Sequence, residues 1–176
     1  AGVMYRYQPK TKEASITASF EHNFAKYMGV KHAVGTNSCG SAMFIALNIV
    51  GVQPGDTILT NAFTFHAVPS VIEHARAVPV LVESNREWAM DPEDLDRKAA
   101  ETGAKVLLMS YMRGHVPDMD AIMDVVEKHG LILIEDCAHA YATLWNGKLL
   151  GTFGEIGCFS TQSSKGLSAG EGGIFI

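Results

Sequence analysis

The chain has 176 residues, of which 47% are hydrophobic and 19% charged, and its formal net charge at pH 7 is −5. These values are typical of one domain with a sizeable core, and they argue against a nucleic-acid partner. The first thirty residues lack a signal-peptide pattern, the longest apolar stretch is too short to span a bilayer, and three widely spaced cysteines indicate reduced thiols. We therefore expect a cytoplasmic protein with no membrane partner and no metal site.

Helical patterns are predicted in three places along the chain. The first helix is expected over Lys12–Met28, where apolar residues recur at helical spacing. The second is expected to begin at Asp91 as the N-terminal cap, with Asp94 as the reciprocal acid of a capping box, and to end at Gly103. The third is expected within residues 117–130, between a proline and a glycine.

Seven strands are predicted between and after these helices, with a hairpin turn at Asn146-Gly147. The segments "LILIE" and "VLLM" are continuously apolar, as expected where helices cover both faces of a parallel sheet. The predicted fold class is therefore α/β, with helices packed on a mostly parallel sheet. The expected strands are 33–36, 57–60, 78–82, 105–109, 131–135, 157–160 and 173–176.

Ligands of such sheets bind beyond the carboxyl ends of the strands, so the residues that follow each strand are the candidates. After the first strand, "GTNSCGSAM" carries Gly40 and Ser41 into a helix, and backbone N–H groups at a helix start suit a phosphate. The P-loop lysine and the Rossmann glycines are both absent, which disfavours a nucleotide-binding module. Taken alone, the segment is better explained as a tight turn with a well-capped helix, because small-residue helix starts are common.

An aromatic residue and a carboxylate follow two further strands. Phe65 in "NAFTFHAV" can stack on a planar ring, although core packing is the commoner role of a phenylalanine. Asp136 in "IEDCAHA" ends an apolar strand, and His139 lies three residues further on. A buried carboxylate needs partners, so Asp136 either serves a ligand or caps the following turn. A metal site is a third reading, but no other ligand has convincing spacing.

Lys165 is the only charged residue between Glu155 and Glu171, and small residues surround it in "FSTQSSKGLSAGEGG". A lysine in a partly desolvated pocket is a usable nucleophile. Ser160 ends the preceding strand and offers a hydroxyl. An anion site, an aromatic face, a carboxylate and an amine together form the set that pyridoxal phosphate needs.

The order of these motifs resembles the DegT/DnrJ/EryC1/StrS family of pyridoxal-phosphate-dependent sugar aminotransferases, which have the aspartate-aminotransferase fold. The resemblance runs from "FEHNFAKYMGVKHAVGTNSCGSAM" to "GKLLGTFGEIGCFSTQSSKGLSAGEGG". It implies that Lys165 forms the internal aldimine and that Asp136 pairs with the pyridine nitrogen. The further implied contacts are His139 with the phenolic oxygen, Phe65 with the ring face, and Ser160 with the phosphate, together with the backbone around Gly40 and Ser41.

The resemblance also implies the architecture. The expected fold is the three-layer α/β/α large domain of this transferase type, with a mostly parallel seven-stranded sheet that contains one antiparallel strand. We expect residues 1–30 to form an N-terminal helical segment and residues 31–176 an incomplete cofactor-binding domain, without the small C-terminal domain. A homodimer with a shared active site is implied as well.

The activity implied is transfer of an amino group, with glutamate as the expected donor, to a keto or aldehyde sugar that is expected to be nucleotide-linked. In "YMRGHVPDMD", Arg113 or His115 could lie near the sugar, although loop packing explains them as well. Two alternatives stay open. One is a pyridoxal-phosphate enzyme for an aminocyclitol or aminobenzoate, and the other is a non-catalytic fragment or partner subunit.

Overall fold

The computed structural model describes residues 15–176, so residues 12–14 of the first predicted helix lie outside the described part. Seven strands form one sheet in the order β1-β9-β8-β5-β4-β2-β3. β9 runs antiparallel to both of its neighbours, and the other pairs are parallel. The predicted α/β fold with one antiparallel strand is confirmed. The strands are β1 Val34–Thr36, β2 Thr57–Asn61, β3 Val78–Val82, β4 Val106–Ser110, β5 Ile132–Asp136, β8 Ile156–Ser160 and β9 Gly173–Phe175.

A two-stranded hairpin lies outside this sheet. Its strands are β6 (Leu144–Trp145) and β7 (Lys148–Leu149), which pair antiparallel. The turn residues Asn146 and Gly147 have φ angles of 48° and 83°. Two successive positive φ angles match the right-handed twist of a two-residue hairpin, and asparagine followed by glycine adopts them readily. The predicted turn is confirmed.

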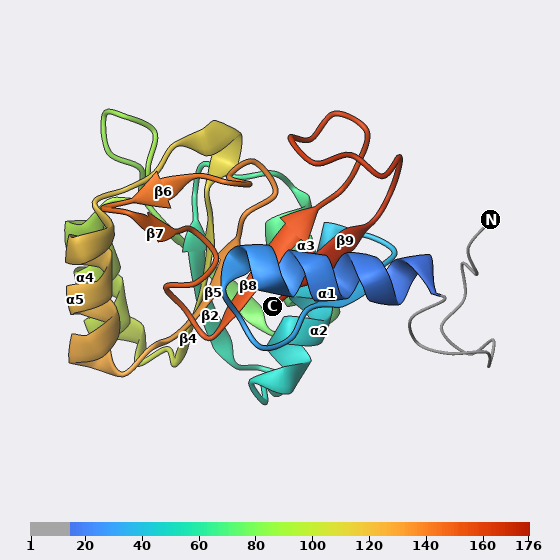
Figure 1. Ribbon diagram of the computed structural model, residues 1–176. Helices are drawn as coiled ribbons and strands as arrows, with labels where there is room; N and C mark the ends of the chain where they lie inside the picture. Colours follow the sequence, from blue (N-terminus) through green and yellow to red (C-terminus); the bar gives the residue numbers. More distant parts are fainter. Residues whose placement is uncertain (1–14) are drawn as a thin grey trace.

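Helices cover both faces of the sheet (Figure 1). Side chains of α1, α4 and α5 belong to one buried cluster with Leu59, Leu107 and Leu133 of the sheet. Side chains of α2 and α3 belong to a second cluster with Ile58, Leu108 and neighbouring strand residues. Alternation along the strands sends successive side chains to opposite faces, which is why both faces are apolar. The helices are α1 Ile16–Met28, α2 Cys39–Ile49, α3 Ala67–His74, α4 Pro92–Thr102 and α5 Met119–His129, with a 3-10 turn, η2, at Met112–Gly114.

The helix ends follow their sequence signals. Ser15 caps α1, and its side chain accepts a hydrogen bond from the Ala18 N–H. Asp118 caps α5, which ends at Gly130 in the left-handed conformation, within the predicted range. Gly103 likewise ends α4 with a φ of 64°. Glycine is favoured at these positions because it lacks the Cβ that makes a positive φ costly.

The capping box predicted at α4 is only half right. Asp91 caps the helix, because its Oδ1 accepts the Glu93 N–H at 2.9 Å. Asp94 does not reciprocate. Its Oδ2 accepts the Glu83 N–H at 2.8 Å instead, because the chain returning from β3 already supplies the Glu83 carbonyl to the Asp91 N–H at 2.9 Å. Asp94 therefore ties the loop after β3 to α4 and pairs there with Lys98 at 3.0 Å.

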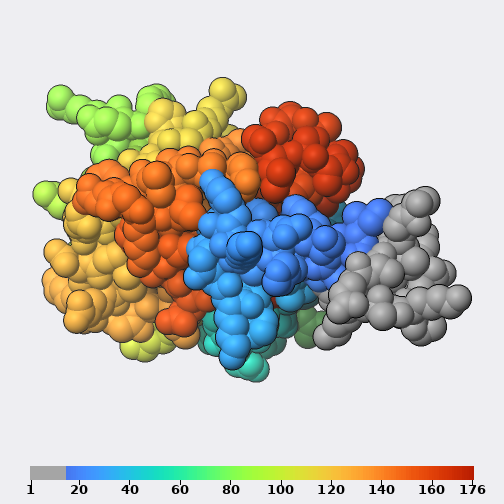
Figure 2. Space-filling model, viewed as in Figure 1, coloured from blue at the N-terminus to red at the C-terminus, as the bar shows by residue number. Residues whose placement is uncertain are grey.

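One edge of the sheet is the candidate location of the functional site. The loops that follow β3, β4 and β8 lie on the same side of the molecule, at the top of Figure 1. Thr36 at the end of β1 and Ser160 at the end of β8 both pair with Gly173 at the start of β9, so they meet at this edge. The chain after β8 forms a projecting lobe beside α1 (Figure 2). Within residues 15–176, no helix is long and apolar enough to cross a bilayer.

Candidate active site

A cavity of about 540 Å³ lies at this edge of the sheet, where α2 and α3 begin and where β5 and β8 end. It brings together six of the seven residues that the sequence predicts as cofactor contacts. Ser41 is the exception, because its N–H and its hydroxyl both bond to Ser38 Oγ, at 3.0 and 3.1 Å. The lining residues from the predicted set are Gly40, Phe65, Asp136, His139, Ser160 and Lys165.

Asp136 is held in the cavity wall with only 4% of its surface exposed. Ser110 Oγ donates a hydrogen bond to its Oδ2 at 2.8 Å, and the Ala138 N–H donates to its Oδ1 at 3.1 Å. Cys39 Sγ lies 3.5 Å from Oδ1 as a third, weaker donor. Every partner donates, which suits an ionised carboxylate. Asp136 thus caps the turn after β5, and the same side chain lines the cavity.

Two of these partners, Ser110 and Cys39, escaped the sequence analysis. Ser110 ends β4, the neighbour of β5, and pairs in register with Asp136. Ser110 is a polar residue at the end of an otherwise apolar strand, and this position is the sequence signal that could have identified it. Burial and the charge of Asp136 raise the pKa of the Cys39 thiol well above its usual value, so Cys39 acts as a neutral donor.

Lys165 and His139 meet across the cavity. Lys165 Nζ lies 2.7 Å from Nε2 of His139. The lysine sits in the loop after β8, and its backbone N–H bonds to the Gln162 carbonyl at 2.9 Å. Burial, and then the positive charge of Lys165, lower the pKa of the His139 imidazole below its usual value. The ring is therefore neutral at pH 7.

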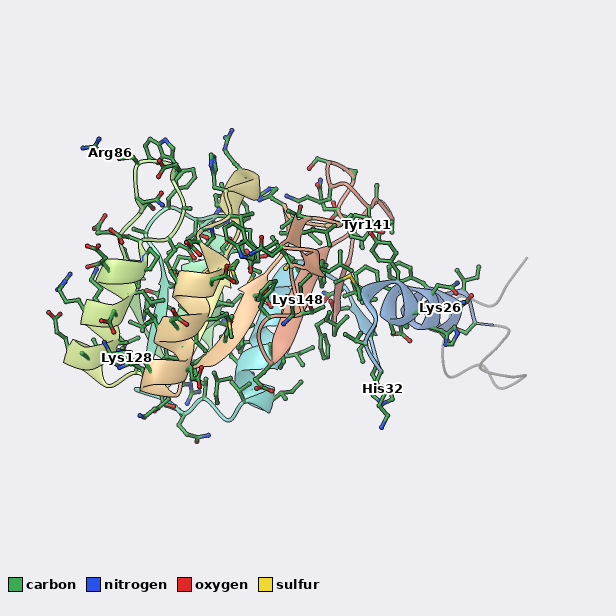
Figure 3. The ribbon with its side chains drawn as sticks, turned by 60° about the vertical axis from the view of Figure 1, so that its left-hand side comes forward. Lys26, His32, Arg86, Lys128, Tyr141 and Lys148 are labelled. Carbon is green, nitrogen blue, oxygen red and sulfur yellow. The ribbon has the colours of Figure 1, made fainter. Side chains whose placement is uncertain are left out.

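The lysine loop is fastened at its base. The Ser163 N–H bonds to the Gly170 carbonyl at 2.8 Å, and the Thr161 N–H bonds to the Gly172 carbonyl at 3.0 Å. Gly173 lets β9 approach the start of α2, because a Cβ there would lie 2.5 Å from the Ser38 carbonyl group. Tyr141, labelled in Figure 3, lies beside this loop, and a Cβ at Gly166 would lie 3.7 Å from its Cδ1. Backbone hydrogen bonds thus close the loop that carries Lys165, and Leu167 packs it against the core.

The two phenylalanines after β2 diverge. Phe65 is 50% exposed and lines the cavity, with its ring 4.1 Å from that of His66. Phe63 packs instead against Trp88 at 5.2 Å, in a separate depression. Only Phe65 presents an aromatic face to the cavity.

The neighbouring carboxylate, Glu135, has a different environment on the opposite face of the sheet. It is fully buried, and Tyr111 donates its hydroxyl to Oε2 at 2.6 Å. The backbone N–H groups of Gly151, Phe153 and Gly154 donate to the same carboxylate, each at 2.7 Å. Burial and this carboxylate raise the pKa of the Tyr111 hydroxyl well above its usual value. Glu135 is a structural anchor for the turn before β8.

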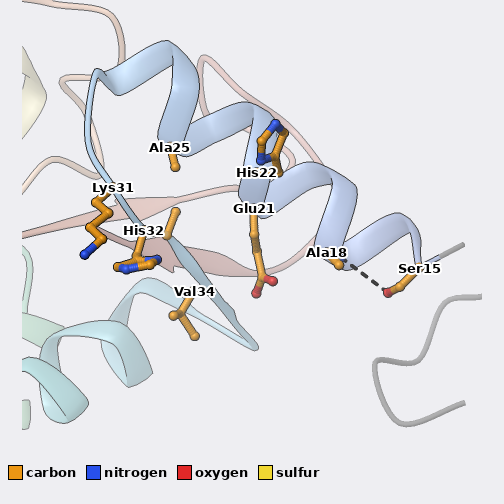
Figure 4. A pocket seen from close by; sticks show the side chains of 9 residues that line it. Ser15, Ala18, Glu21, His22, Ala25, Lys31, His32 and Val34 are labelled. Carbon is orange, nitrogen blue, oxygen red and sulfur yellow. Dashed lines mark hydrogen bonds between the residues drawn. The ribbon is translucent and has the colours of Figure 1, made fainter. Parts of the chain in front are cut away.

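A second cavity, of about 450 Å³, lies between α1 and β1 (Figure 4). His22, His32 and Lys31 line it together with Glu21, whose carboxylate accepts the Gly35 N–H at 2.7 Å. It contains none of the predicted cofactor contacts. Residues 15–176 hold no group of three or more side chains that could bind a metal.

The donor set of the first cavity fits pyridoxal phosphate. An amine, a buried carboxylate, an exposed aromatic ring and the N-terminal turn of α2 with the Ser160 hydroxyl lie around one space. These match an aldehyde, a pyridine nitrogen, a planar ring and a phosphate, in that order. Six of the seven predicted cofactor contacts thus lie together at this one edge.

Comparison with known proteins agrees with this fit. The chain is 35% identical over 158 residues to GDP-perosamine synthase of Vibrio cholerae, covering 89% of this chain and 43% of that protein. It is 37% identical over 158 residues to L-glutamine:2-deoxy-scyllo-inosose aminotransferase of Streptoalloteichus tenebrarius, covering 89% of this chain and 37% of that protein.

A solved structure shares the fold. The putative sugar aminotransferase Spr1654 from Streptococcus pneumoniae, in its PLP form, superimposes with a TM-score of 0.85 at 28% identity and covers 90% of this chain and 44% of its own. The chain thus spans about two fifths of the length of these relatives. The model of the DegT/DnrJ/EryC1/StrS aminotransferase family matches residues 9–176. The chain therefore belongs to this family of pyridoxal-phosphate-dependent aminotransferases.

Proposed function

We propose that the protein is a pyridoxal-phosphate-dependent aminotransferase that transfers an amino group to a keto or aldehyde sugar. The observation that carries the proposal is the single cavity that collects Lys165, Asp136, His139, Phe65 and Ser160. In this proposal Lys165 holds the cofactor covalently. Bound pyridoxal phosphate supplies an electron sink for the chemistry at the carbon that bears the amino group.

Each side chain then has a definite task. Asp136 would pair with the pyridine nitrogen and keep a proton on it, because Ser110 and the Ala138 N–H hold its carboxylate in place. Once the amino donor has displaced it from the cofactor, the free amine of Lys165 would move the proton between the α-carbon of the donor and the cofactor carbon that bears the nitrogen. Phe65 stacks on the ring and fixes its plane.

The remaining contacts orient the two ends of the cofactor. His139 donates a hydrogen bond to the phenolic oxygen. Ser160 and the backbone at Gly40 bind the phosphate at the start of α2, where N–H groups and the helix dipole favour an anion. The backbone of Ser41 belongs to the same helix turn, although its N–H already bonds to Ser38.

The relatives support two candidate substrate classes. The name GDP-perosamine synthase supports a nucleotide-linked sugar as the acceptor. For this candidate we propose glutamate as the donor, as the family resemblance implies. The second candidate is an aminocyclitol ketone with glutamine as donor, which the 37% identity to L-glutamine:2-deoxy-scyllo-inosose aminotransferase supports. We further propose that residues 31–176 form the cofactor-binding domain after an N-terminal segment of residues 1–30. A cytoplasmic homodimer with a shared active site completes the proposal.

The half-reaction with the amino donor tests this function. The protein is loaded with pyridoxal phosphate and given L-glutamate or L-glutamine, and the keto acid formed is quantified by mass spectrometry. We expect one keto acid per bound cofactor for one of the two donors. Lys165→Ala should form none, whereas the matched variant Lys105→Ala should equal the wild type, because Lys105 is exposed at the opposite edge of the sheet. Equal yields from both variants would refute the role of Lys165.

A further inference from the structure

Trp88 is a large aromatic residue that the protein holds out to solvent. It lies in the loop between β3 and α4, and it is 58% exposed. Its φ of 63° falls in the left-handed region, which is costly for a residue with a bulky side chain. Core packing does not explain this conformation, because most of the residue is exposed. A strained backbone at an exposed tryptophan makes function the candidate reason.

Hydrogen bonds fix the loop that carries Trp88. The side-chain Oδ1 of Asn85 accepts the N–H groups of Glu87 and Ala89, both at 3.0 Å. The Asn85 N–H bonds to the Ala89 carbonyl at 2.8 Å, and the Trp88 N–H bonds to the Asn85 carbonyl at 3.2 Å. The backbone of Trp88 is therefore held in one conformation, so that a ligand that stacks on its ring has little ordering cost to meet.

Trp88 forms part of the wall of a cavity of about 510 Å³, which is separate from the cavity that holds Lys165. Phe63 lines the same cavity, and the centre of its ring lies 5.2 Å from that of Trp88. The ring of His115 lies 6.2 Å from Phe63 on another side. Three aromatic rings from the loops after β2, β3 and β4 thus gather in one place. Such a group suits a planar ligand, because flat rings stack on aromatic faces.

Two polar side chains of this cavity indicate which planar ligand fits. Glu83 lines it with an exposed carboxylate, which only accepts hydrogen bonds when it is ionised. Ser84 lines it as well, and its buried hydroxyl has no hydrogen-bond partner among residues 15–176, so a polar ligand would give it one. Guanine presents two adjacent donors to a carboxylate, its ring N–H and its amino group. Uracil has a single ring N–H flanked by two carbonyl oxygens, which a carboxylate repels.

Two guanidinium groups lie near these rings. Arg86 lines the cavity and extends outward from its loop (Figure 3), and Arg113 is exposed in η2. In the part of the chain that the structure describes, neither forms an ion pair. Glu83 and Glu87 oppose the charge of Arg86 on its own loop, whereas Arg113 stands on a different element. A guanidinium without a carboxylate partner suits a phosphate.

The turn η2 connects this cavity with the one that holds Lys165. The Arg113 N–H donates to Nδ1 of His139 at 3.3 Å, and His139 lines the Lys165 cavity. The guanidinium of Arg113 is also close enough to help lower the pKa of the His139 imidazole. His115, which follows η2, contacts Phe63 on the other side. In Figure 1, η2 lies between the loop after β3 and the loop after β8.

We propose that Trp88, Phe63 and Glu83 bind the guanine base of a guanosine-diphosphate-linked acceptor. Arg113 holds the diphosphate, and the sugar reaches toward Lys165. The inference rests on the proposed function, because it names the class of acceptor that the same enzyme would use. Its test nevertheless needs no amino transfer, since the guanosine diphosphate portion alone should bind.

Calorimetric titration with GDP tests the base contact. The protein is first saturated with pyridoxal phosphate, which keeps GDP out of the anion site at α2. We expect Trp88→Ala to weaken GDP binding at least about tenfold, because the stacking contact is lost, and Trp88→Phe to stay within about threefold. Ile49→Ala is the matched control, since Ile49 is 59% exposed at the far end of α2 and should bind as the wild type does. Equal GDP affinity in Trp88→Ala and the wild type would overturn the proposal, as would a wild type that does not bind GDP.

Two further variants test the polar contacts. The wild type should bind GDP at least about tenfold more tightly than UDP, and Glu83→Gln should reduce this preference, because an amide no longer accepts both guanine donors. Arg113→Gly keeps the backbone N–H and relieves the φ of 54°, so it removes only the guanidinium. We expect it to weaken GDP binding about tenfold. An unchanged preference in Glu83→Gln would overturn the assignment of guanine, and an unchanged affinity in Arg113→Gly would overturn the phosphate contact.

Fluorescence separates a bound base from a second copy of the chain as the group that covers Trp88. Trp145 is the other tryptophan, so Trp145→Phe leaves the emission of Trp88 alone. We expect GDP to quench this emission and dilution of the free protein to leave it unchanged. Emission that changes on dilution would show that another copy covers Trp88, and it would overturn the proposal.

Failure of this inference and failure of the proposed function give different results. Keto acid formed from the amino donor by a protein that does not bind GDP would overturn the guanine site and leave the aminotransferase proposal intact. GDP binding that depends on Trp88, in a protein that forms no keto acid, would support the guanine site and count against the aminotransferase.

Discussion

Glu135 and Asp136 are adjacent carboxylates at the end of one strand, and they face opposite sides of the sheet. Glu135 is enclosed, and four protein donors satisfy both of its oxygens. Asp136 lines a cavity and has three partners, one of which is a weak thiol donor. The same chemical group therefore serves the fold on one face and, in our proposal, a ligand on the other. Both carboxylates are buried, so burial does not separate the two roles. The difference is that Glu135 is enclosed by its donors, whereas Asp136 borders a cavity.

Removing the charge of Glu135 should have the largest effect on stability. Glu135→Gln places an amide NH₂ against donors from Tyr111 and from the turn before β8. We expect a loss of about 3–5 kcal/mol in the free energy of unfolding, as for a broken buried charge network. Urea denaturation measures this loss. A loss below about 1 kcal/mol would mean that Glu135 is not an anchor.

The matched change on the other face should act on function instead. Asp136→Asn keeps the shape of the side chain but removes the charge that we assign to the pyridine nitrogen. We expect amino transfer to fall by about 10²–10³, as when a key electrostatic contact is lost, while the free energy of unfolding changes by about 1 kcal/mol. Steady-state kinetics and urea denaturation of the same sample separate the two effects. Full activity in Asp136→Asn would show that the charge of Asp136 is not needed for amino transfer.

Ser110→Ala removes one hydrogen-bond partner of Asp136 and leaves the carboxylate in place. The bond from Ser110 Oγ to Asp136 is 2.8 Å long, and hydrogen bonds to charged groups contribute about 1.5–3 kcal/mol. If Asp136 is held for a ligand, cofactor affinity should weaken about tenfold. Titration with pyridoxal phosphate monitors the change. An unaltered affinity would mean that Cys39 and the Ala138 N–H suffice to hold Asp136.

Asp94 is a third carboxylate, half-buried in the first turn of α4. Burial alone would raise its pKa, but the Glu83 N–H, Lys98 and Arg97 outweigh that effect and hold the pKa at about 2. Because the unfolded pKa is about 3.9, its contribution to stability is complete above about pH 4 and disappears as the pH falls through about 2. Asp94→Asn should therefore destabilise the protein by about 1–2 kcal/mol at pH 7 and have little effect near pH 2. Thermal unfolding at both pH values checks this. A difference that does not shrink on acidification would be inconsistent with the account.

The strand pattern was predictable from the sequence because each strand of the buried sheet is an apolar run bounded by turn residues. The segment 78–82 coincides with β3, and the others differ by one or two residues. The residues that follow the strands were also predictable, since the carboxyl ends of parallel strands share an edge. Six of the predicted contacts lie around one cavity for this reason.

The partners of those residues were not predictable, because they come from distant parts of the chain. Ser110 and Cys39 bond to Asp136 across 26 and 97 residues. Asp94 fits a capping box by spacing, yet the returning chain supplies a better donor from Glu83. Ser41 has the right residue type for a phosphate contact, but its hydroxyl turns toward Ser38. Local patterns indicate which groups are available, and tertiary contacts decide which of them face the ligand.

Borohydride reduction of the protein in the presence of pyridoxal phosphate, followed by peptide mapping, shows whether Lys165 holds the cofactor. It makes any covalent link between the cofactor and a lysine permanent, and mass spectrometry identifies the lysine. We predict one pyridoxyl adduct per chain, located on Lys165, with the adduct lost in Lys165→Ala and retained in Lys105→Ala. An adduct spread over exposed lysines, or one that persists in Lys165→Ala, would contradict the assignment of this cavity as the cofactor site.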